Sequence, residues 1–160
     1  MDVYEAVTSR RAVRGFTDRP VPGEVLERVL SAAAWAPSGS NLQPWHVYVV
    51  TGGPLAELKK RAAERIAAGD AWDEREYEMY PAELKSPYRE RRAAFAEQRY
   101  GALGIARGDI VARQRAAAGN WACFGAPAAL FCYIDRDLGQ AQWSDVGMYL
   151  QTVMLLLRAA

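Results

Sequence analysis

Two segments far apart in the chain carry the clearest β-strand pattern, and they limit what this chain can fold into. Residues 46–51 (HVYVVT) are β-branched and aromatic, and residues 128–134 (AALFCYI) form a second apolar run. Two strands are few for 160 residues, and a two-stranded sheet is not stable in water by itself. The strands therefore need helices, or further strands, to cover them.

Apolar residues at helical spacing predict that helices supply much of this cover. The strongest pattern spans residues 24–35, and Pro37 is expected to end that helix. A largely apolar helix is expected over residues 143–160, with Ser144 or Asp145 as its N-cap and one broad buried face. Further helices are predicted at residues 3–9 and 55–68, and Gly52-Gly53-Pro54 is predicted to form a turn.

The sequence contains no repeat or linker, so residues 1–160 are expected to form one domain. Residues 70–119 are charged and irregular in pattern, and we expect them to form short helices in an excursion over the main layer. This excursion is either a solvated surface or a lid over a pocket. Residues 156–160 (LLRAA) carry no helix stop signal, so we expect the chain to be truncated inside a helix, with the remaining strands absent.

The composition excludes several classes of site. The formal net charge is +1, which argues against a dedicated nucleic-acid-binding protein. One histidine and two cysteines are too few for most zinc sites, and we expect no metal site. The N-terminus has no signal-peptide pattern, and the longest strongly apolar run is far too short for a membrane span, so a cytoplasmic location without membrane attachment is expected.

Three arginines within five residues form a local cluster of cations. Arg10, Arg11 and Arg14 can present guanidinium groups to a phosphate or to carbonyl oxygens. The same residues follow the predicted first helix, whose C-terminal end favours a cation. The cluster is therefore a candidate ligand site or a solvated, helix-terminating group of charges.

A turn-forming segment, residues 36–45 (APSGSNLQPW), joins the second predicted helix to the first strand. Its backbone N–H groups can form an anion-binding nest, and the amides of Asn41 and Gln43 offer donors and acceptors that suit the edge of a flavin or nucleobase. The alternative is an ordinary turn before a strand. Trp45 is expected in the core, and His46 is expected to be structural rather than a catalytic base.

The order of these features resembles the N-terminal motifs of the nitroreductase family, the flavin mononucleotide (FMN)-dependent NAD(P)H oxidoreductases. A short helix, Arg-Arg-x-x-Arg-x-Phe, a helix, Ala-Pro-Ser-x-x-Asn-x-Gln-Pro-Trp and a strand follow one another. The segments 124–127 (FGAP) and 145–147 (DVG) also match, so the resemblance covers essentially the whole chain, although residues 70–119 match loosely.

The resemblance implies an α+β fold: a nitroreductase-like sandwich with a mostly antiparallel sheet flanked by helices. It also implies an intertwined homodimer with FMN at the interface between subunits. The long apolar helix would be central in that interface. In the family, a backbone donor to the reactive flavin nitrogen and a basic phosphate-binding segment lie beyond this helix, so the sheet and the site are expected to be incomplete in this chain.

The family's cofactor contacts can be carried over residue by residue. Arg10 would bind the FMN phosphate or ribityl chain, Arg11 and Ala12 would contact the cofactor partly through backbone, and Arg14 would approach the pyrimidine edge of the flavin. Family members often have Ser in place of Ala12, so one hydrogen bond is expected to be missing. The residues expected to reach the FMN of the partner subunit, or to support that contact, are Pro37, Ser38, Gly39, Asn41 and Gln43.

The implied function is an oxidoreductase that passes two electrons from NADH or NADPH through FMN to a nitroaromatic or quinone-type acceptor. The flavin carries this chemistry, so no catalytic side chain is assigned. Two alternatives remain: an FMN enzyme that acts by dehalogenation, flavin breakdown or dehydrogenation, and a non-catalytic fragment without flavin.

Overall fold

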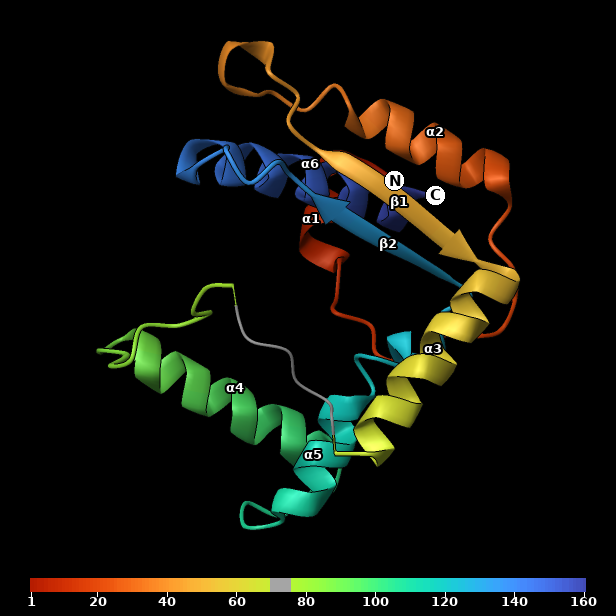
Figure 1. Ribbon diagram of the computed structural model, residues 1–160. Coiled ribbons are helices and arrows are strands. Elements are labelled where there is room, and N and C mark those ends of the chain that lie inside the picture. The colour runs from red at the N-terminus through yellow and green to blue at the C-terminus, as the bar shows by residue number, and fades with distance from the viewer. Residues whose placement is uncertain (70–75) are drawn as a thin grey trace. The chain divides into compact units, whose positions relative to one another are not determined.

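A computed structural model describes residues 1–69 and 76–160, which divide into two compact units (Figure 1). Unit 1 comprises Met1–Glu57 and Gly125–Ala160, and unit 2 comprises Leu58–Phe124. The predicted excursion belongs to unit 2, but its residues 70–75 lie outside the described part.

Unit 1 contains the two predicted strands, β1 (His46–Thr51) and β2 (Ala128–Tyr133). They pair in antiparallel fashion, with His46 opposite Tyr133 and Thr51 opposite Ala128. The helices of this unit, and the short 3-10 turn η1, come before β1 and after β2: α1 (Val3–Ser9), α2 (Gly23–Ala33), η1 (Gly39–Asn41) and α6 (Gln140–Ala159). The first turns of α3 (Gly52–Ala67) also lie in unit 1, and the 3-10 turn η2 (Cys123–Gly125) spans the boundary.

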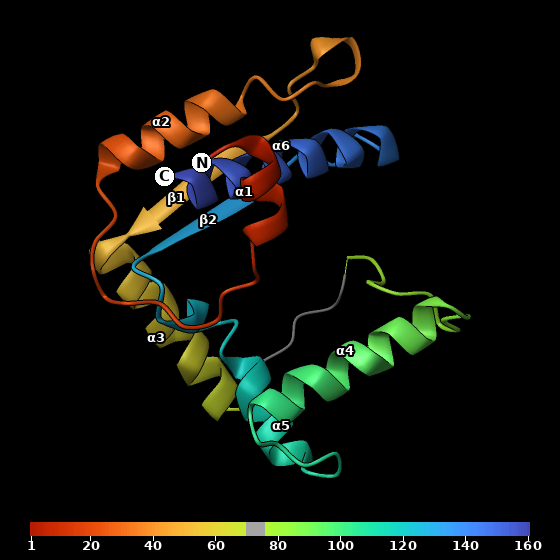
Figure 2. The same cartoon turned by 180° about the vertical axis from the view of Figure 1, so that it is seen from behind.

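The core of unit 1 forms where α2 and α6 meet one face of the sheet. Val29 and Ala33 of α2 are buried together with Tyr149 and Val153 of α6. The ring of Trp45 stacks on Tyr149 with a centroid distance of 4.9 Å, which confirms the prediction that this tryptophan belongs to the core. Helices α1 and α6 lie together on one side of the strands, as the two opposite views show (Figures 1 and 2).

The two faces of the sheet have different surroundings because side chains alternate along a strand. Val47 and Cys132 point to the core face. On the other face His46 stacks on Tyr133 at 5.0 Å, and Tyr48 stacks on the same ring at 5.7 Å. His46 is exposed and takes part in this aromatic stack, which fits a structural role.

The ends of the helices correct several predictions. Helix α6 begins at Gln140, where the N–H of Gly139 donates to Oε1 of Gln142 at 3.2 Å, so neither Ser144 nor Asp145 is its N-cap. Gly52-Gly53-Pro54 is not a turn but the first turn of α3. Gly52 has a φ of +55°, a backbone conformation that favours glycine. Proline has no backbone N–H, and it is tolerated at Pro54 because N–H groups in the first turn of a helix have no partner within the helix.

The apolar face of α6 is narrower than predicted. Tyr149 and Val153 are buried, whereas Met154 and Leu157 are 42% and 48% exposed. The helix packs its buried stripe against α2 and leaves other apolar side chains at the surface of unit 1. No helix in the described residues is long and apolar enough to cross a membrane.

Unit 2 contains the remainder of α3 together with α4 (Tyr88–Ala102) and α5 (Ile110–Ala118), so the excursion is helical as expected. Neither α4 nor α5 has a buried residue among those described. Guanidinium–aromatic contacts join its segments: Arg92 lies 4.4 Å from the Tyr80 ring, and Arg113 of α5 lies 4.4 Å from the Tyr100 ring of α4. Asp109 caps α5 by accepting from the N–H of Ala112 at 2.9 Å.

The packing of α6 on α2 yields a first testable prediction. Val153→Ala removes two buried methyl groups from the core and should lower the free energy of unfolding by about 1–3 kcal/mol. Val3→Ala makes the same chemical change at a position that is 71% exposed. This variant should change the free energy of unfolding by less than about 0.5 kcal/mol. Urea unfolding of both variants measures the difference, and equal losses would contradict the described core.

Candidate functional site

The loop between α2 and β1, residues 38–43, has an unusual backbone. Ser40, Asn41 and Gln43 have positive φ angles of +51°, +56° and +47°. Residues other than glycine enter this left-handed region at a cost of about 1 kcal/mol or more each, although Asn tolerates it better than most. The loop therefore needs specific contacts to hold it in this conformation.

Two hydrogen bonds supply such contacts. The Ser38 hydroxyl oxygen accepts from the backbone N–H of Gln43 at 2.9 Å. The carboxylate of Asp145, on α6, accepts from the N–H of Gly39, with both oxygens 3.3 Å from the nitrogen. Asp145 is only 5% exposed, so this hydrogen bond connects the loop to a buried side chain of α6.

The two amide side chains predicted to meet a cofactor lie side by side in this loop. Nε2 of Gln43 donates to Oδ1 of Asn41 at 3.2 Å. This bond leaves the Asn41 amide nitrogen as a donor and the Gln43 amide oxygen as an acceptor, and both residues are exposed. An adjacent donor and acceptor match the alternating N–H and C=O groups of a flavin edge.

Of the two alternatives that the sequence left open for this loop, the hydrogen bonds favour an ordinary turn over an anion-binding nest. The Gly39 N–H donates to Asp145, and the N–H groups of Asn41 and Leu42 donate to the carbonyls of Ser38 and Gly39. Most of the amides that a nest would use are therefore engaged within unit 1. The buried carboxylate behind the loop also disfavours an anion, so the loop suits an uncharged polar group.

The arginine cluster lies in an irregular segment after α1. Nη1 of Arg11 donates to the carbonyl of Thr8 at 2.7 Å and to that of Arg10 at 3.0 Å. Arg11 therefore satisfies a carbonyl at the end of α1, whereas the sequence had suggested Arg10 as the helix-end charge. Nη1 of Arg14 lies 3.4 Å from the carbonyl of Ala12. The Arg10 guanidinium has no partner among residues 1–69 and 76–160, which leaves it available to a ligand.

Helix α6 holds the two clusters at opposite ends. Nε of Arg158 donates to the Ser9 hydroxyl at 3.0 Å, next to the arginine cluster, whereas Asp145 holds the 38–43 loop. The two α6 residues are thirteen positions apart, which corresponds to about 20 Å along a helix. The structure therefore brings residues 38–43 together, and it attaches Ser9, which directly precedes the arginine cluster, to a different part of α6.

Burial changes the acidity of two groups close to α6. It raises the pKa of the Cys132 thiol, and it also raises the pKa of the Tyr149 phenol, with a smaller contribution from nearby Cys132. Both groups stay uncharged at neutral pH and belong to the core. On the exposed sheet face, the hydrogen bond with Tyr48 raises the pKa of Tyr133. None of these three groups belongs to the predicted cofactor site.

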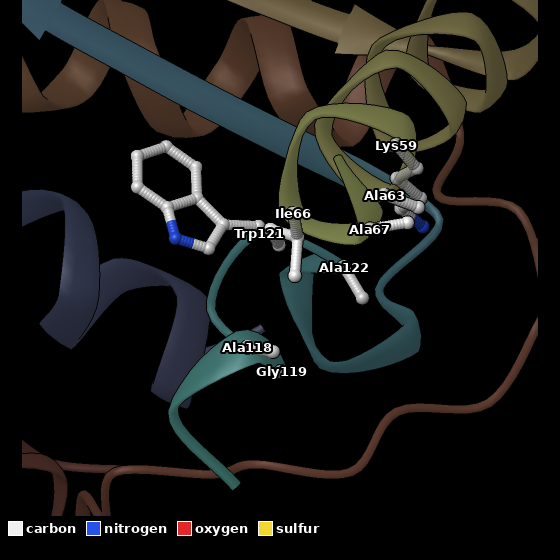
Figure 3. A pocket seen from close by; sticks show the side chains of 8 residues that line it. All are labelled: Lys59, Ala63, Ile66, Ala67, Ala118, Gly119, Trp121 and Ala122. Carbon is white, nitrogen blue, oxygen red and sulfur yellow. The ribbon is translucent and has the colours of Figure 1, made fainter. Parts of the chain in front are cut away.

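Two hollows lie away from the predicted residues. A groove of about 590 Å³ in unit 1 is bounded by residues 16–22, the start of α2 and the end of α6. A pocket of about 370 Å³ in unit 2 lies between α3 and residues 118–122 (Figure 3). Its walls are apolar apart from the Lys59 amine and the Trp121 indole nitrogen, so it offers little for catalysis. Neither hollow is lined by any of the nine predicted cofactor residues.

The sequence analysis missed the contact made by Asp145. It placed this residue at a helix start, whereas it is the sixth residue of α6 and faces the 38–43 loop. A signal was present: Asp145 lies one turn before Tyr149 and two turns before Val153, on the same apolar stripe. An acidic residue on a buried stripe implies a specific hydrogen-bond partner.

The second prediction concerns the bond inside the loop. Ser38→Ala removes the acceptor for the Gln43 N–H and should speed hydrogen exchange of that amide, at a cost of about 1 kcal/mol in stability. Ser40→Ala is the matched control, because the Ser40 hydroxyl has no partner in the described part of the chain. Exchange measured by NMR should differ between the two variants, and the same rate in both would refute the assigned bond.

Comparison with known proteins identifies a family that matches nearly the whole chain. The profile of the nitroreductase family matches residues 7–160. The chain is 40% identical over 153 residues to nitrobenzene nitroreductase of Ectopseudomonas oleovorans, covering 96% of this chain and 67% of that protein.

Two solved structures share the fold. The FMN- and NADPH-dependent nitroreductase NfnB of Sphigopyxis sp. strain HMH is 44% identical with a TM-score of 0.93, covering 98% of this chain and 70% of that one. The FMN-dependent NfnB of Mycobacterium smegmatis in complex with NADPH is 32% identical with a TM-score of 0.90, covering 98% and 69%. The chain thus spans about two thirds of the length of these relatives. It belongs to the nitroreductase family of oxidoreductases and has the α+β fold of that family.

Proposed function

We propose that this chain is part of an FMN-dependent oxidoreductase that takes electrons from NAD(P)H and passes them to a nitroaromatic or quinone-type acceptor. The observation that carries the proposal is the exposed amide pair of the 38–43 loop, held next to α6 in a chain whose relatives are FMN-dependent. When bound, FMN would supply the two-electron chemistry, and the protein would supply binding, orientation and electrostatics.

The arginine cluster is proposed to bind the charged part of the cofactor. Arg10, whose guanidinium has no partner in the described residues, would bind the phosphate or the ribityl chain. Arg11 and Ala12 would contact the cofactor partly through backbone, since the Arg11 side chain already donates to Thr8. Arg14 would lie near the pyrimidine edge and stabilise negative charge on the reduced flavin.

The 38–43 loop is proposed to meet the uncharged part. Asn41 and Gln43 would present one donor and one acceptor to the flavin or ribityl group. Pro37, Ser38 and Gly39 would shape the approach, with the Ser38 hydroxyl holding the Gln43 backbone. This division follows from charge: the arginines attract the phosphate, whereas the Asp145 carboxylate behind the loop repels it.

Two copies of the chain are proposed to form each site. The loop and the arginine cluster lie at opposite ends of α6, which supports a site that takes one cluster from each subunit of a homodimer. Apolar side chains left exposed near both clusters support a large interface between copies. They lie on α1, after α2 and on α6: Tyr4 (85%), Trp35 (90%), Trp143 (50%) and Leu157 (48%).

The acceptor is proposed from the relatives. One of them is named for the reduction of nitrobenzene, and another, 37% identical over 158 residues, is a 4-nitrobenzoate reductase of Pseudomonas putida. These two matches cover nearly the whole chain, whereas iodotyrosine deiodinase 1 of Rattus norvegicus matches 65 residues, so the relatives favour a nitroaromatic acceptor over dehalogenation. The preference between NADH and NADPH, the quinone option and the cytoplasmic location expected from the sequence stay predictions.

A visible absorption spectrum tests this function. The chain is saturated with FMN, passed through gel filtration and treated with NADPH or NADH, alone and as a version extended at its C-terminus with a relative's sequence. We expect a retained flavin band that the nucleotide bleaches and nitrobenzene restores. A protein that retains no flavin in either form, or a flavin that neither nucleotide reduces, would contradict the proposal.

The third prediction concerns Arg14. Arg14→Ala should weaken FMN binding about tenfold or more and lower the flavin reduction potential by tens of millivolts, because a tenfold loss specific to the reduced form corresponds to about 30 mV for two electrons. Arg19→Ala removes the same charge from an exposed position five residues along the chain and should change neither value. An unchanged potential in a redox titration of the Arg14 variant would exclude its proposed role.

A further inference from the structure

The contact between Asp145 and Gly39 joins residues 106 positions apart in the sequence and has features that stability alone does not explain. Asp145 is a buried charged residue, 5% exposed, and in the described part of the chain its carboxylate has a single donor, the Gly39 N–H shared between its two oxygens. A buried carboxylate with one shared donor is poorly compensated for the loss of water. An apolar residue of similar size would pack there at lower cost.

The position of Asp145 on α6 also gives it no role in starting the helix. At the start of α6 the Gln142 side chain accepts from the N–H of Gly139. The helix dipole acts most strongly in the first turn, and Asp145, the sixth residue, lies beyond that turn. The carboxylate therefore serves the loop rather than its own helix.

The loop that it holds is the one with the exposed amide pair. Gly39 begins η1, and the left-handed residues Ser40 and Asn41 follow directly. The Ser38 hydroxyl fixes the far end of the loop at Gln43, but Ser38 belongs to the loop itself. Asp145 is the described hydrogen-bonding side chain that connects the loop to another element, so it sets where the Asn41–Gln43 pair lies relative to α6.

We propose that Asp145 is a positioning residue for cofactor binding: its buried carboxylate holds Gly39, and thereby places the amides of Asn41 and Gln43 to receive the flavin. This proposal rests on the proposed function. It differs from a structural role, because a change at Asp145 should loosen the loop and weaken FMN binding without a matching loss of global stability.

Three variants of the full chain separate these roles. Asp145→Leu removes the acceptor but fills the site with apolar volume, whereas Asp145→Asn keeps one oxygen that can accept from Gly39. Val153→Ala is the control, since it disturbs the same stripe of α6 two turns away without touching the loop bond. Each variant is measured for its thermal midpoint, for amide exchange of residues 39–43 without cofactor, and for its dissociation constant for FMN.

For Asp145→Leu we expect a thermal midpoint equal to or above that of the original chain, loop exchange at least tenfold faster, and FMN binding at least tenfold weaker. Asp145→Asn should restore the FMN dissociation constant to within about threefold, the partial rescue expected of a retained hydrogen-bond acceptor. Val153→Ala should lower the midpoint and leave loop exchange and FMN affinity within about twofold of the original chain.

Three results would overturn the proposal. Unchanged loop exchange in Asp145→Leu would show that the carboxylate does not hold the loop. Faster exchange with unchanged FMN affinity would show that the held loop does not position the cofactor. Equal effects of Asp145→Leu and Val153→Ala on all three measurements would assign Asp145 a structural role. If the original chain bound no FMN, the proposed function would be refuted. The exchange measurement is made without cofactor, so it would still show whether Asp145 holds the loop.

Discussion

The packing of α6 is the constraint on which the rest of unit 1 depends. One stripe of this helix, Tyr149 and Val153, closes the core against α2 and the strands. The same helix contacts the two segments proposed to bind the cofactor: Asp145 accepts from Gly39, and Arg158 donates to Ser9. A single rigid element therefore sets both the stability of unit 1 and the separation of its two candidate ligand clusters, about 20 Å along the helix.

Local patterns were sufficient to predict much of the fold. The bounds of α1 agree with the predicted 3–9, since Asp2 caps it by accepting from Glu5 N–H. β1 agrees with 46–51, because β-branched residues favour extended backbone. The motifs around the two clusters were also sufficient to place the chain in the nitroreductase family. These features are encoded by neighbouring residues, so one sequence reveals them.

Features set by distant contacts could not be predicted in this way. The sequence left open whether residues 36–45 form an anion-binding nest or an ordinary turn, because the carboxylate that accepts from the N–H of Gly39 belongs to Asp145, far along the chain. It favoured a wide buried face on α6, but Met154 and Leu157 of that face are exposed in unit 1. The helix-end cation was expected at Arg10, but the bond to the Thr8 carbonyl comes from Arg11, whose predicted contact with the cofactor stays a prediction.

The central claim is that one FMN is held by the arginine cluster of one subunit and the 38–43 loop of the other. Hybrid dimers of Arg10→Ala and Asn41→Ala chains, purified with two different tags, test it most directly. If the claim holds, each variant alone loses FMN, whereas the hybrid has one intact site and retains one FMN per two chains. If each site lay within a single chain, every site in the hybrid would carry one substitution, and the hybrid would retain no FMN. That result would contradict the account.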